Sequence, residues 1–205
     1  MEKTRRQGFF KMLIGILLVL AALQAVREAA AAGLSLFIPG RAADMAVTAA
    51  LALALSVWTV RHKGEVPVFP KRFTKGYLAA SILLAGLCIG APANFINGLP
   101  AVLNTLYGSV ATPVYEELLF RGWVWERAGR ILRKGSSVFL LNVLLFTLWH
   151  AGYMFPQMMA GDWAAVAMKM AAGAGYGLLL GFIRLKAGNC YAGMLAHGFA
   201  NLFMV

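Results

Sequence analysis

The sequence predicts an all-α fold, a polytopic bundle of about seven transmembrane helices with a cytoplasmic amino terminus. Of its 205 residues, 60% are hydrophobic and only 13% are charged, whereas soluble domains have about 45–50% apolar and about 25% charged residues. The apolar residues also fall into runs of about 20, the length that crosses a bilayer. We therefore expect a single integral-membrane domain, residues 1–205, in a plasma membrane of the bacterial type.

Seven apolar segments can be distinguished along the chain. They are Phe9–Val26, Ala42–Val60, Gly76–Phe95, Leu99–Trp125, Ser137–Phe155, Ala164–Arg184 and Gly188–Val205. The first resembles a signal peptide, because basic residues precede it and Ala30–Ala32 resembles a cleavage site. Its run of about 18 residues is longer than the 7–15 usual in signal peptides, so we expect a retained helix.

Basic residues predict the orientation of the bundle, because Lys and Arg concentrate in cytoplasmic loops. In a seven-span arrangement, 15 of the 19 fall on one side: Lys3, Arg5, Arg6, Lys11, Arg61, Lys63, Lys71, Arg72, Lys75, Arg127, Arg130, Arg133, Lys134, Arg184 and Lys186. The opposite loops hold only Arg27 and Arg41, each near an acidic residue, Glu28 or Asp44. We thus attribute the net charge of +11 to membrane topology, and expect no nucleic-acid partner. The two cysteines, Cys88 and Cys190, lie far apart in apolar segments and have no CxxC spacing, so we expect them to be packing residues.

The fourth segment contains the stretch PVYEELLFRGWVWER, which places Glu116, Glu117 and Arg121 within an apolar run. Three ionised residues at the centre of a membrane helix cost on the order of 8–10 kcal/mol before pairing. They are therefore expected to be paired and to face the bundle interior or a wet cavity. Glu117 and Arg121 are four residues apart and share a helix face, which predicts an ion pair. Glu116 points about 100° away and is free for another role.

Two histidines lie at a similar depth on other segments. From the predicted cytoplasmic face, Glu116, His150 and His197 lie about 15, 21 and 13 Å inward at 1.5 Å per residue. His197 and Asn201 share a helix face in HGFAN, and His150 follows Phe146 by four residues in FTLWH. We expect Phe146 to pack in the core or to line a substrate groove.

A carboxylate, two imidazoles and an amide at one depth can hydrolyse an amide bond. Glu116 would act as general base, with His150 orienting the same water. His197 and Asn201 would donate hydrogen bonds to the oxyanion of the tetrahedral intermediate.

A metal mechanism is a second possibility from the residues alone. Glu116, His150 and His197 match the three-ligand count of a catalytic site for Zn²⁺ or another divalent metal. However, the HExxH motif of zinc proteases is absent. The GxSxG serine motif and an intramembrane pair of aspartates are absent too. Whether a metal takes part stays open.

Taken in order, EELLFR, FTLWH and HGFAN resemble the EExxxR, FxxxH and HxxxN motifs of the CPBP family of intramembrane proteases. This family includes type II CAAX prenyl endopeptidases and bacteriocin-processing or immunity proteins. The matched region is 113–205. The resemblance implies a glutamate-dependent peptidase whose cavity opens to the cytoplasmic side. It assigns water activation to Glu116 and His150, the oxyanion site to His197 and Asn201, and a supporting role to Glu117 and Arg121.

Two other functions are compatible with the sequence. A non-catalytic relative would bind a peptide or a membrane protein, as an immunity or scaffold protein does, without needing all four site residues. A proton-coupled transporter would need polar residues along a path to both faces, and Gly76–Leu99 and Ala164–Ile183 offer little beyond Asn94, Asn97 and Lys169. We therefore expect a peptidase whose partners are the lipid bilayer and a peptide or membrane-protein substrate. The substrate's identity, including whether it is prenylated, stays open.

Overall fold

A computed structural model describes residues 2–62 and 64–203, and no strand occurs among them. The helices are α1 (Glu2–Leu34), α2 (Gly40–Arg61), α3 (Lys75–Gly90), α4 (Pro92–Asn97), α5 (Leu99–Leu106), η1 (Tyr107–Ala111), α6 (Thr112–Glu116), η2 (Glu117–Val124), α7 (Trp125–Gly129), α8 (Gly135–Gly152), α9 (Phe155–Met159), α10 (Trp163–Ala187) and α11 (Cys190–Leu202). The predicted basic residue Lys63 and the last two residues of the seventh predicted span lie outside the described residues, as do the side chains of residues 2–5 and 93.

Five described helices are long and apolar enough to cross a membrane. They are Arg6–Leu34, Gly40–Arg61, Lys75–Asn97, Gly135–Gly152 and Trp163–Ala187, and they coincide with the first, second, third, fifth and sixth predicted spans. The all-helical membrane architecture is thus confirmed. The count of seven spans and the cytoplasmic amino terminus stay predictions.

The two remaining predicted spans are helical but differ from a regular membrane helix. The fourth is a continuous succession of helical turns from Leu99 to Gly129, in which α turns alternate with the wider π turns η1 and η2. The seventh corresponds to α11, whose 13 residues extend over about 20 Å. That is shorter than the roughly 30 Å hydrocarbon core.

Helix α1 extends further than predicted. It continues to Leu34, so Arg27 and Glu28 belong to the helix and the connection to α2 is only 35–39. The prediction that these two residues lie in an external loop is therefore wrong. The physical reason is that Ala29 to Ala32 are strong helix formers, and the first proline after them is Pro39.

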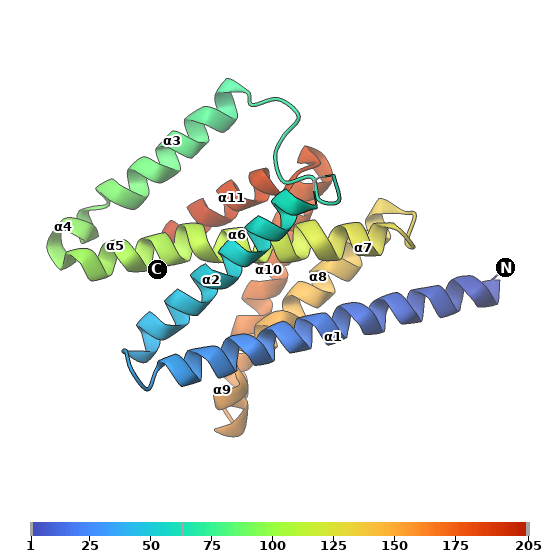
Figure 1. Ribbon diagram of the computed structural model, residues 1–205, viewed down its shortest axis with the longest axis horizontal. Helices are drawn as coiled ribbons and strands as arrows, with labels where there is room; N and C mark the ends of the chain where they lie inside the picture. Colours follow the sequence, from blue (N-terminus) through green and yellow to red (C-terminus); the bar gives the residue numbers. More distant parts are fainter. Residues whose placement is uncertain (1, 63, 204–205) are drawn as a thin grey trace.

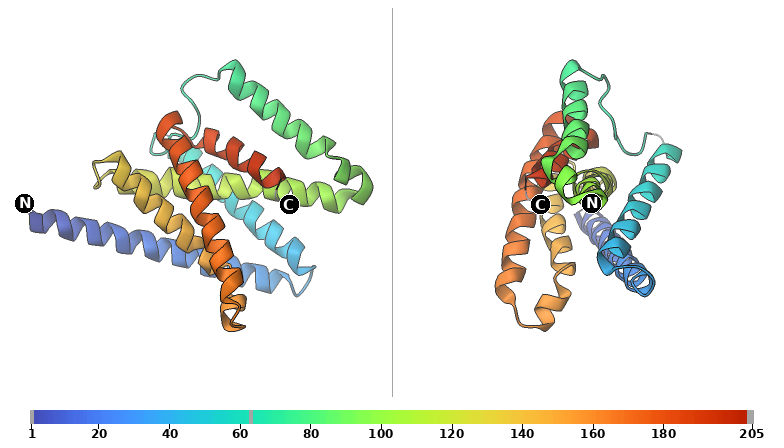
Figure 2. Two further views of the ribbon diagram at one scale, coloured as in Figure 1. Left: turned by 180° about the vertical axis from the view of Figure 1, so that it is seen from behind. Right: turned by 90° about the vertical axis from the view of Figure 1, so that its left-hand side faces the viewer.

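The helix formed by α5 to α7 lies at the centre of the molecule (Figure 1). Helices α1 and α2 pack on one side of it, the α8–α10 pair lies on the other, and α11 runs along it (Figures 1 and 2). Helix α3 stands apart, with contacts to α5 and α11. Helices α8 and α11, which carry the predicted histidines, therefore both pack against this central helix.

The wide turns of the central helix surround the glutamate pair. The first, η1, ends two residues before Pro113, whose ring would clash with the carbonyl four residues back in a regular α-helix. In the second, η2, the carbonyl of Phe120 accepts a hydrogen bond from Asn142 Nδ2 (2.7 Å) and that of Arg121 accepts one from Arg184 Nε (2.8 Å). Side chains of α8 and α10 thereby fasten the irregular segment in place.

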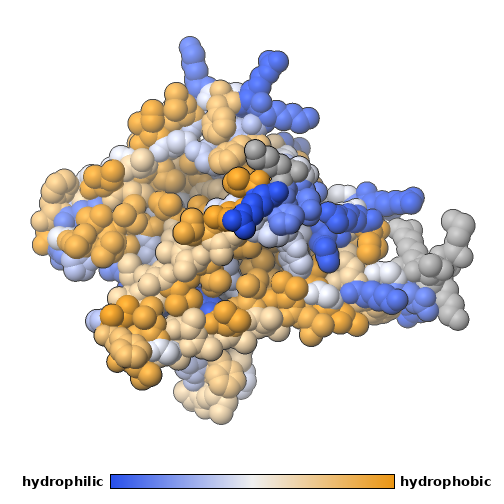
Figure 3. Space-filling view, viewed as in Figure 1, coloured by the Kyte–Doolittle hydropathy of each residue, from blue (hydrophilic) through white to orange (hydrophobic). Residues whose placement is uncertain are grey.

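Three of the basic loops meet at one end of the bundle. The segment between α2 and α3 reaches the end of α7 through an ion pair between Glu65 and Arg130 (3.8 Å). It reaches the start of α11 through backbone hydrogen bonds from Cys190 N to Pro67 O (3.0 Å) and from Tyr191 N to Val68 O (2.9 Å). In Figure 3 hydrophilic side chains gather along the upper and right-hand edges, beside a largely hydrophobic surface. We call the end of the bundle formed by the loops 62–74, 130–134 and 188–189 the basic end.

Candidate active site

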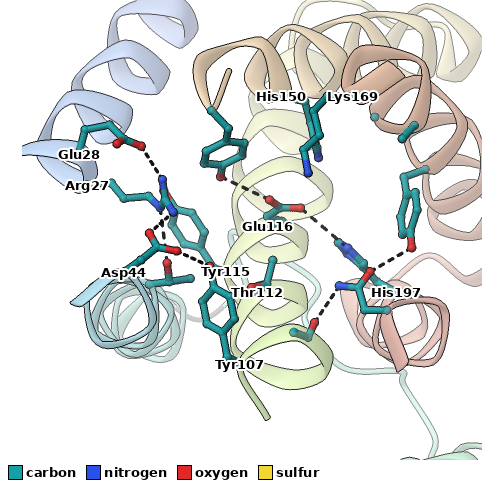
Figure 4. A pocket seen from close by; sticks show the side chains of 17 residues that line it. Arg27, Glu28, Asp44, Tyr107, Thr112, Tyr115, Glu116, His150, Lys169 and His197 are labelled. Carbon is teal, nitrogen blue, oxygen red and sulfur yellow. Dashed lines mark hydrogen bonds and ion pairs between the residues drawn. The ribbon is translucent and has the colours of Figure 1, made fainter. Parts of the chain in front are cut away.

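A cavity of about 610 Å³ lies between the central helix and helices α1, α2, α8, α10 and α11 (Figure 4). The lining includes all four predicted catalytic residues: Glu116, His150, His197 and Asn201. The other lining residues are Arg27, Glu28, Asp44, Thr48, Tyr107, Gly108, Thr112, Tyr115, Tyr153, Lys169, Ala172, Gly173 and Tyr176. The prediction that three separate segments bring these groups to one place is confirmed.

Glu116 and His197 form the buried floor of the cavity. Each is 3% exposed, and Nε2 of His197 lies 3.9 Å from Oε2 of Glu116. The other carboxylate oxygen, Oε1, accepts a hydrogen bond from the hydroxyl of Tyr153 (3.5 Å). That hydroxyl in turn accepts from Nε1 of Trp149 (2.6 Å). Glu116 is therefore held from two sides while still facing the open volume.

Glu117 and Arg121 lie behind the cavity wall, both fully buried. Their predicted ion pair is confirmed, with 3.2 Å between Nη1 of Arg121 and Oε1 of Glu117. Nη2 of Arg121 points to the carbonyls of Tyr176 and Gly177 at 3.4 Å each, which connects the pair to α10. Oε1 of Glu117 also lies 3.3 Å from Nδ1 of His197. Glu117 thus contacts a predicted catalytic histidine, a relationship that the sequence analysis missed.

The turn before α11 directs His197 back toward the centre. Gly188 ends α10 with φ +70°, a left-handed conformation that favours glycine. The side chain of Asn189 then accepts a hydrogen bond from Ala192 N (3.0 Å) and starts α11. On α11, a Cβ atom at Gly193 would lie 2.3 Å from Oε2 of Glu117. Glycine at this position is what allows the Glu117 carboxylate to lie against α11.

His150 is oriented by the backbone carbonyl of Phe146, four positions earlier, and its ring lies against the ring of that phenylalanine. Its Nδ1 lies 2.8 Å from the carbonyl oxygen of Phe146. Because a carbonyl only accepts, Nδ1 carries the proton and Nε2 of the neutral ring has a lone pair. Across the cavity wall, a Cβ atom at Gly173 would lie 2.9 Å from Cγ of His150. The imidazole therefore packs directly on the backbone of α10.

Phe146 itself does not line the cavity. Its ring is fully buried between two site residues, with the guanidinium of Arg121 4.2 Å from its centroid and the ring of His150 4.6 Å away. Of the two predicted roles, core packing is confirmed and lining a groove is not seen. The ring of Phe146 thus separates the guanidinium of Arg121 from the imidazole of His150.

Asn201 is held by hydrogen bonds at both ends of its amide. Oδ1 accepts from the hydroxyl of Tyr176 (3.0 Å), and Nδ2 donates to the carbonyl of Gly108 (2.7 Å). The ring of Tyr176 also lies 5.1 Å from that of His197. Since Nδ2 carries two protons, one remains for a group in the cavity.

A polar cluster that the sequence analysis missed forms the opposite wall. Arg27 is 7% exposed and donates to Asp44 Oδ1 and to Glu28 Oε1 (2.6 Å). Its guanidinium lies 4.6 Å from the centroid of Tyr153, and Asp44 Oδ2 accepts from Tyr107 (2.7 Å). The available signal was the absence of any helix breaker between Val26 and Ala32, which places Arg27 within α1 instead of beyond it.

The predicted metal ligands are Glu116, His150 and His197. Within residues 2–62 and 64–203, no group of three or more His, Cys, Asp or Glu side chains is arranged to hold a metal ion. Glu116, His150 and His197 line the same cavity but do not form a ready three-ligand site in this conformation. Metal use stays a prediction.

The exposed residues of the cavity lining lie on α1 and α10. They are Glu28, Lys169 and Ala172. Lys169 lies about 9 Å along α10 from Trp163 and about 27 Å from Ala187, at the basic end. Lys169 thus lies nearer the end of α10 that is away from the basic end. The expectation of a cavity that opens to the cytoplasmic side stays a prediction.

Comparison with known protein families matches residues 98–203 to the family described as Type II CAAX prenyl endopeptidase Rce1-like. The chain belongs to this family. Membership makes it an integral membrane protein of a protease family, and the match includes every motif residue from Glu116 to Asn201. In this Rce1-like chain, α1 and α2 lie outside the match, so Arg27 and Asp44 belong to the unmatched part of the cavity wall. Neither the search of curated proteins nor the search of solved structures found a match to the chain.

Proposed function

We propose that this protein is an intramembrane endopeptidase that cleaves a peptide bond of a membrane-associated protein with a water molecule activated by Glu116 and His150. The observation that carries the proposal is the convergence of Glu116, His150, His197 and Asn201 on one cavity, with 3.9 Å between Glu116 and His197. Membership of a protease family adds independent support.

In the first step, the water oxygen attacks the carbonyl carbon of the scissile peptide. Glu116 takes the proton that the water loses, and the lone pair on Nε2 of His150 accepts a hydrogen bond from the other water hydrogen. Figure 4 shows His150 pointing toward Glu116 from across the cavity. The two acceptors thereby hold the water from different sides.

The carbonyl oxygen becomes an oxyanion, which His197 and Asn201 stabilise. The unshared proton of Asn201 Nδ2 provides one hydrogen bond, and its direction is set by Tyr176 and Gly108. His197 provides the second hydrogen bond from Nε2. This requires a proton on each ring nitrogen, because the Nδ1 proton is bonded to Glu117. One such donor is worth roughly 3–4 kcal/mol of transition-state stabilisation.

The second step breaks the carbon–nitrogen bond. The protonated Glu116 returns its proton to the leaving nitrogen, so the amine departs neutral and the carboxylate is regenerated. Over one turnover the protons and charges therefore balance with only this chain, the peptide and one water molecule.

The test is cleavage of a peptide library by the purified protein in detergent, read by mass spectrometry, with each peptide supplied with and without a prenyl group. We expect products from the wild type, and a loss of at least about 100-fold for Glu116→Gln and His150→Ala. Glu65→Gln is the matched control, because Glu65 is half-exposed at the basic end, in a surface ion pair with Arg130, and should cleave as the wild type does.

Parallel reactions with a chelator, followed by addition of Zn²⁺, test metal use separately. Activity that falls with the chelator and returns with the metal would require a metal step that the present mechanism omits. Folded protein that yields no Glu116-dependent product would instead favour a non-catalytic, peptide-binding relative.

A further inference from the structure

Lys169 is a charged residue of the cavity lining that the proposed mechanism does not use. It lies on α10 about 9 Å from Trp163, within a helix long and apolar enough to cross a membrane. A charged side chain in such a helix is costly in hydrocarbon, and it generally faces the protein interior or a wet cavity, where it marks a functional site. The position of Lys169 therefore calls for a partner that is charged or polar.

Lys169 is on the face of α10 that lines the cavity. Ala172, Gly173 and Tyr176 follow it by three, four and seven positions, which is the spacing of a single helix face. All of these residues line the same cavity. At Gly173, a Cβ atom would lie 2.9 Å from Cγ of His150, so the imidazole packs on α10 one turn away from Lys169. The lysine side chain thus begins on the cavity side of its helix, close to His150.

The ammonium group of Lys169 is directed into the cavity. Figure 4 shows the side chains of Lys169 and His150 pointing toward Glu116 from the same side. The charges of Lys169 and of Glu116 both act on His150 electrostatically, which agrees with this arrangement. In the same view His197 approaches Glu116 from another direction. The cation therefore lies beside the groups that the mechanism assigns to the attacking water, and not beside Asn201.

Lys169 differs from Arg27, the arginine of the cavity lining, in its ionic partners. Arg27 is paired with Glu28 (2.6 Å) and with Asp44. Within the part of the chain that the structure describes, no ion pair joins Lys169 to a carboxylate. An ammonium group has three donors and no acceptor. Lys169 is therefore available to an anionic group that enters the cavity.

We propose that Lys169 binds a carboxylate of the peptide substrate, close to the bond that is cleaved. That the occupant is a peptide rests on the proposed function. A peptide carries carboxylates at its C-terminus and on Asp and Glu side chains, and an ammonium binds either through charge-assisted hydrogen bonds. Because Lys169 is close to His150, the bound carboxylate lies within a few residues of the scissile bond.

Retention of peptides without cleavage tests this role. Glu116→Gln protein is immobilised in detergent and exposed to the peptide library in two matched pairs of forms. One pair has a C-terminal acid or amide, and the other has Glu or Gln at an internal position. We expect the carboxylate form of at least one pair to be retained roughly 10-fold better, measured by mass spectrometry, as for a hydrogen bond to a charged group. The pair that shows the preference identifies the source of the carboxylate.

Variants of Lys169 in the same background assign the preference to its charge. Lys169→Met should abolish the preference while the amide and Gln forms bind as before, and Lys169→Arg should keep it. Lys186→Met is the matched control, because Lys186 is on the same helix but outside the cavity lining, and it should also keep the preference. A lysine that merely supports the fold or His150 would not produce this pattern.

The opposite results would overturn the role of Lys169. They are equal retention of both members of each pair, retention of neither member, or a preference that persists in Lys169→Met. The experiment also separates this inference from the proposed function. A protein that prefers carboxylate peptides but cleaves none would refute the proposed function and leave the role of Lys169 intact. A protein that cleaves both members of each pair equally well would refute the role of Lys169 alone.

Discussion

Glu117 lies between Arg121 and His197, with its Oε1 atom 3.2 Å from Nη1 of the arginine and 3.3 Å from Nδ1 of the histidine. All three side chains are buried. The second glutamate of the pair therefore connects the buried Arg121 to His197, the proposed oxyanion donor, while the first faces the cavity. Adjacent residues of the same type have separate roles because they point in different directions from one helix.

The first prediction concerns this division of roles. Glu117→Gln removes the charge that compensates Arg121, and breaking a buried ion pair costs roughly 3–5 kcal/mol. We expect a lower melting temperature and a lower folded yield in detergent, measured by fluorescence-detected size exclusion after heating. Glu116→Gln should keep a yield close to that of the wild type while losing activity. Equal yields from the two variants, with both inactive, would show that the proposed division is wrong.

The second prediction uses the close approach of α11 to the central helix. In Gly193→Ala, the new Cβ atom would meet Oε2 of Glu117 at 2.3 Å, so the carboxylate has to move away from His197. We expect a destabilisation of about 1–3 kcal/mol together with a loss of cleavage. Gly175→Ala is the control, since a Cβ atom there meets nothing within 4 Å. A Gly193→Ala protein as stable and active as that control would contradict the described packing.

The third prediction concerns the hydroxyl of Tyr176, which donates to Oδ1 of Asn201. Tyr176→Phe removes this donor but keeps the ring against His197. One hydrogen bond contributes about 0.5–1.5 kcal/mol, so we expect kcat to fall roughly 2- to 13-fold with KM little changed. Steady-state kinetics on the peptide found in the library screen measure this. A change confined to KM would mean that Tyr176 acts on substrate binding instead of on Asn201.

The fourth prediction concerns the wall that α1 and α2 contribute. Arg27→Gln removes the charged partner of Asp44 and leaves the hydrogen bond from the hydroxyl of Tyr107. The loss of these charge-assisted hydrogen bonds should cost about 1–3 kcal/mol, visible as a lower melting temperature. Arg41→Gln is a suitable comparison on the same helix pair, because Arg41 is exposed and donates a hydrogen bond to Asn104 (2.7 Å). Similar melting temperatures for the two variants would argue against a buried role for Arg27.

Much of the site could be predicted because helical periodicity is local. The spacing of four residues predicts the Glu117–Arg121 pair, and the same spacing puts Phe146 beside His150 and His197 beside Asn201. Counting residues from the predicted ends of the segments also gives similar depths for groups on different helices. The cost of placing charges in hydrocarbon then indicates that these groups have to meet.

The contacts between helices could not be predicted in this way. The bond between Glu117 and His197 joins residues 80 positions apart, and the Tyr153–Glu116 and Tyr176–Asn201 contacts depend on how the helices rotate and cross. The wall formed by Arg27 and Asp44 was missed for a related reason. Its residues lie near predicted span ends, where a shift of a few residues converts a loop position into a buried one.

The sequence by itself determined the membrane class, the helical character, the four candidate catalytic residues and the basic end, because these follow from composition and from periodicity along one chain. The tertiary structure decided which glutamate faces the cavity and what holds each histidine. These properties depend on the packing of helices that are distant in sequence, where a single glycine, such as Gly193 against Glu117, sets how closely two backbones approach.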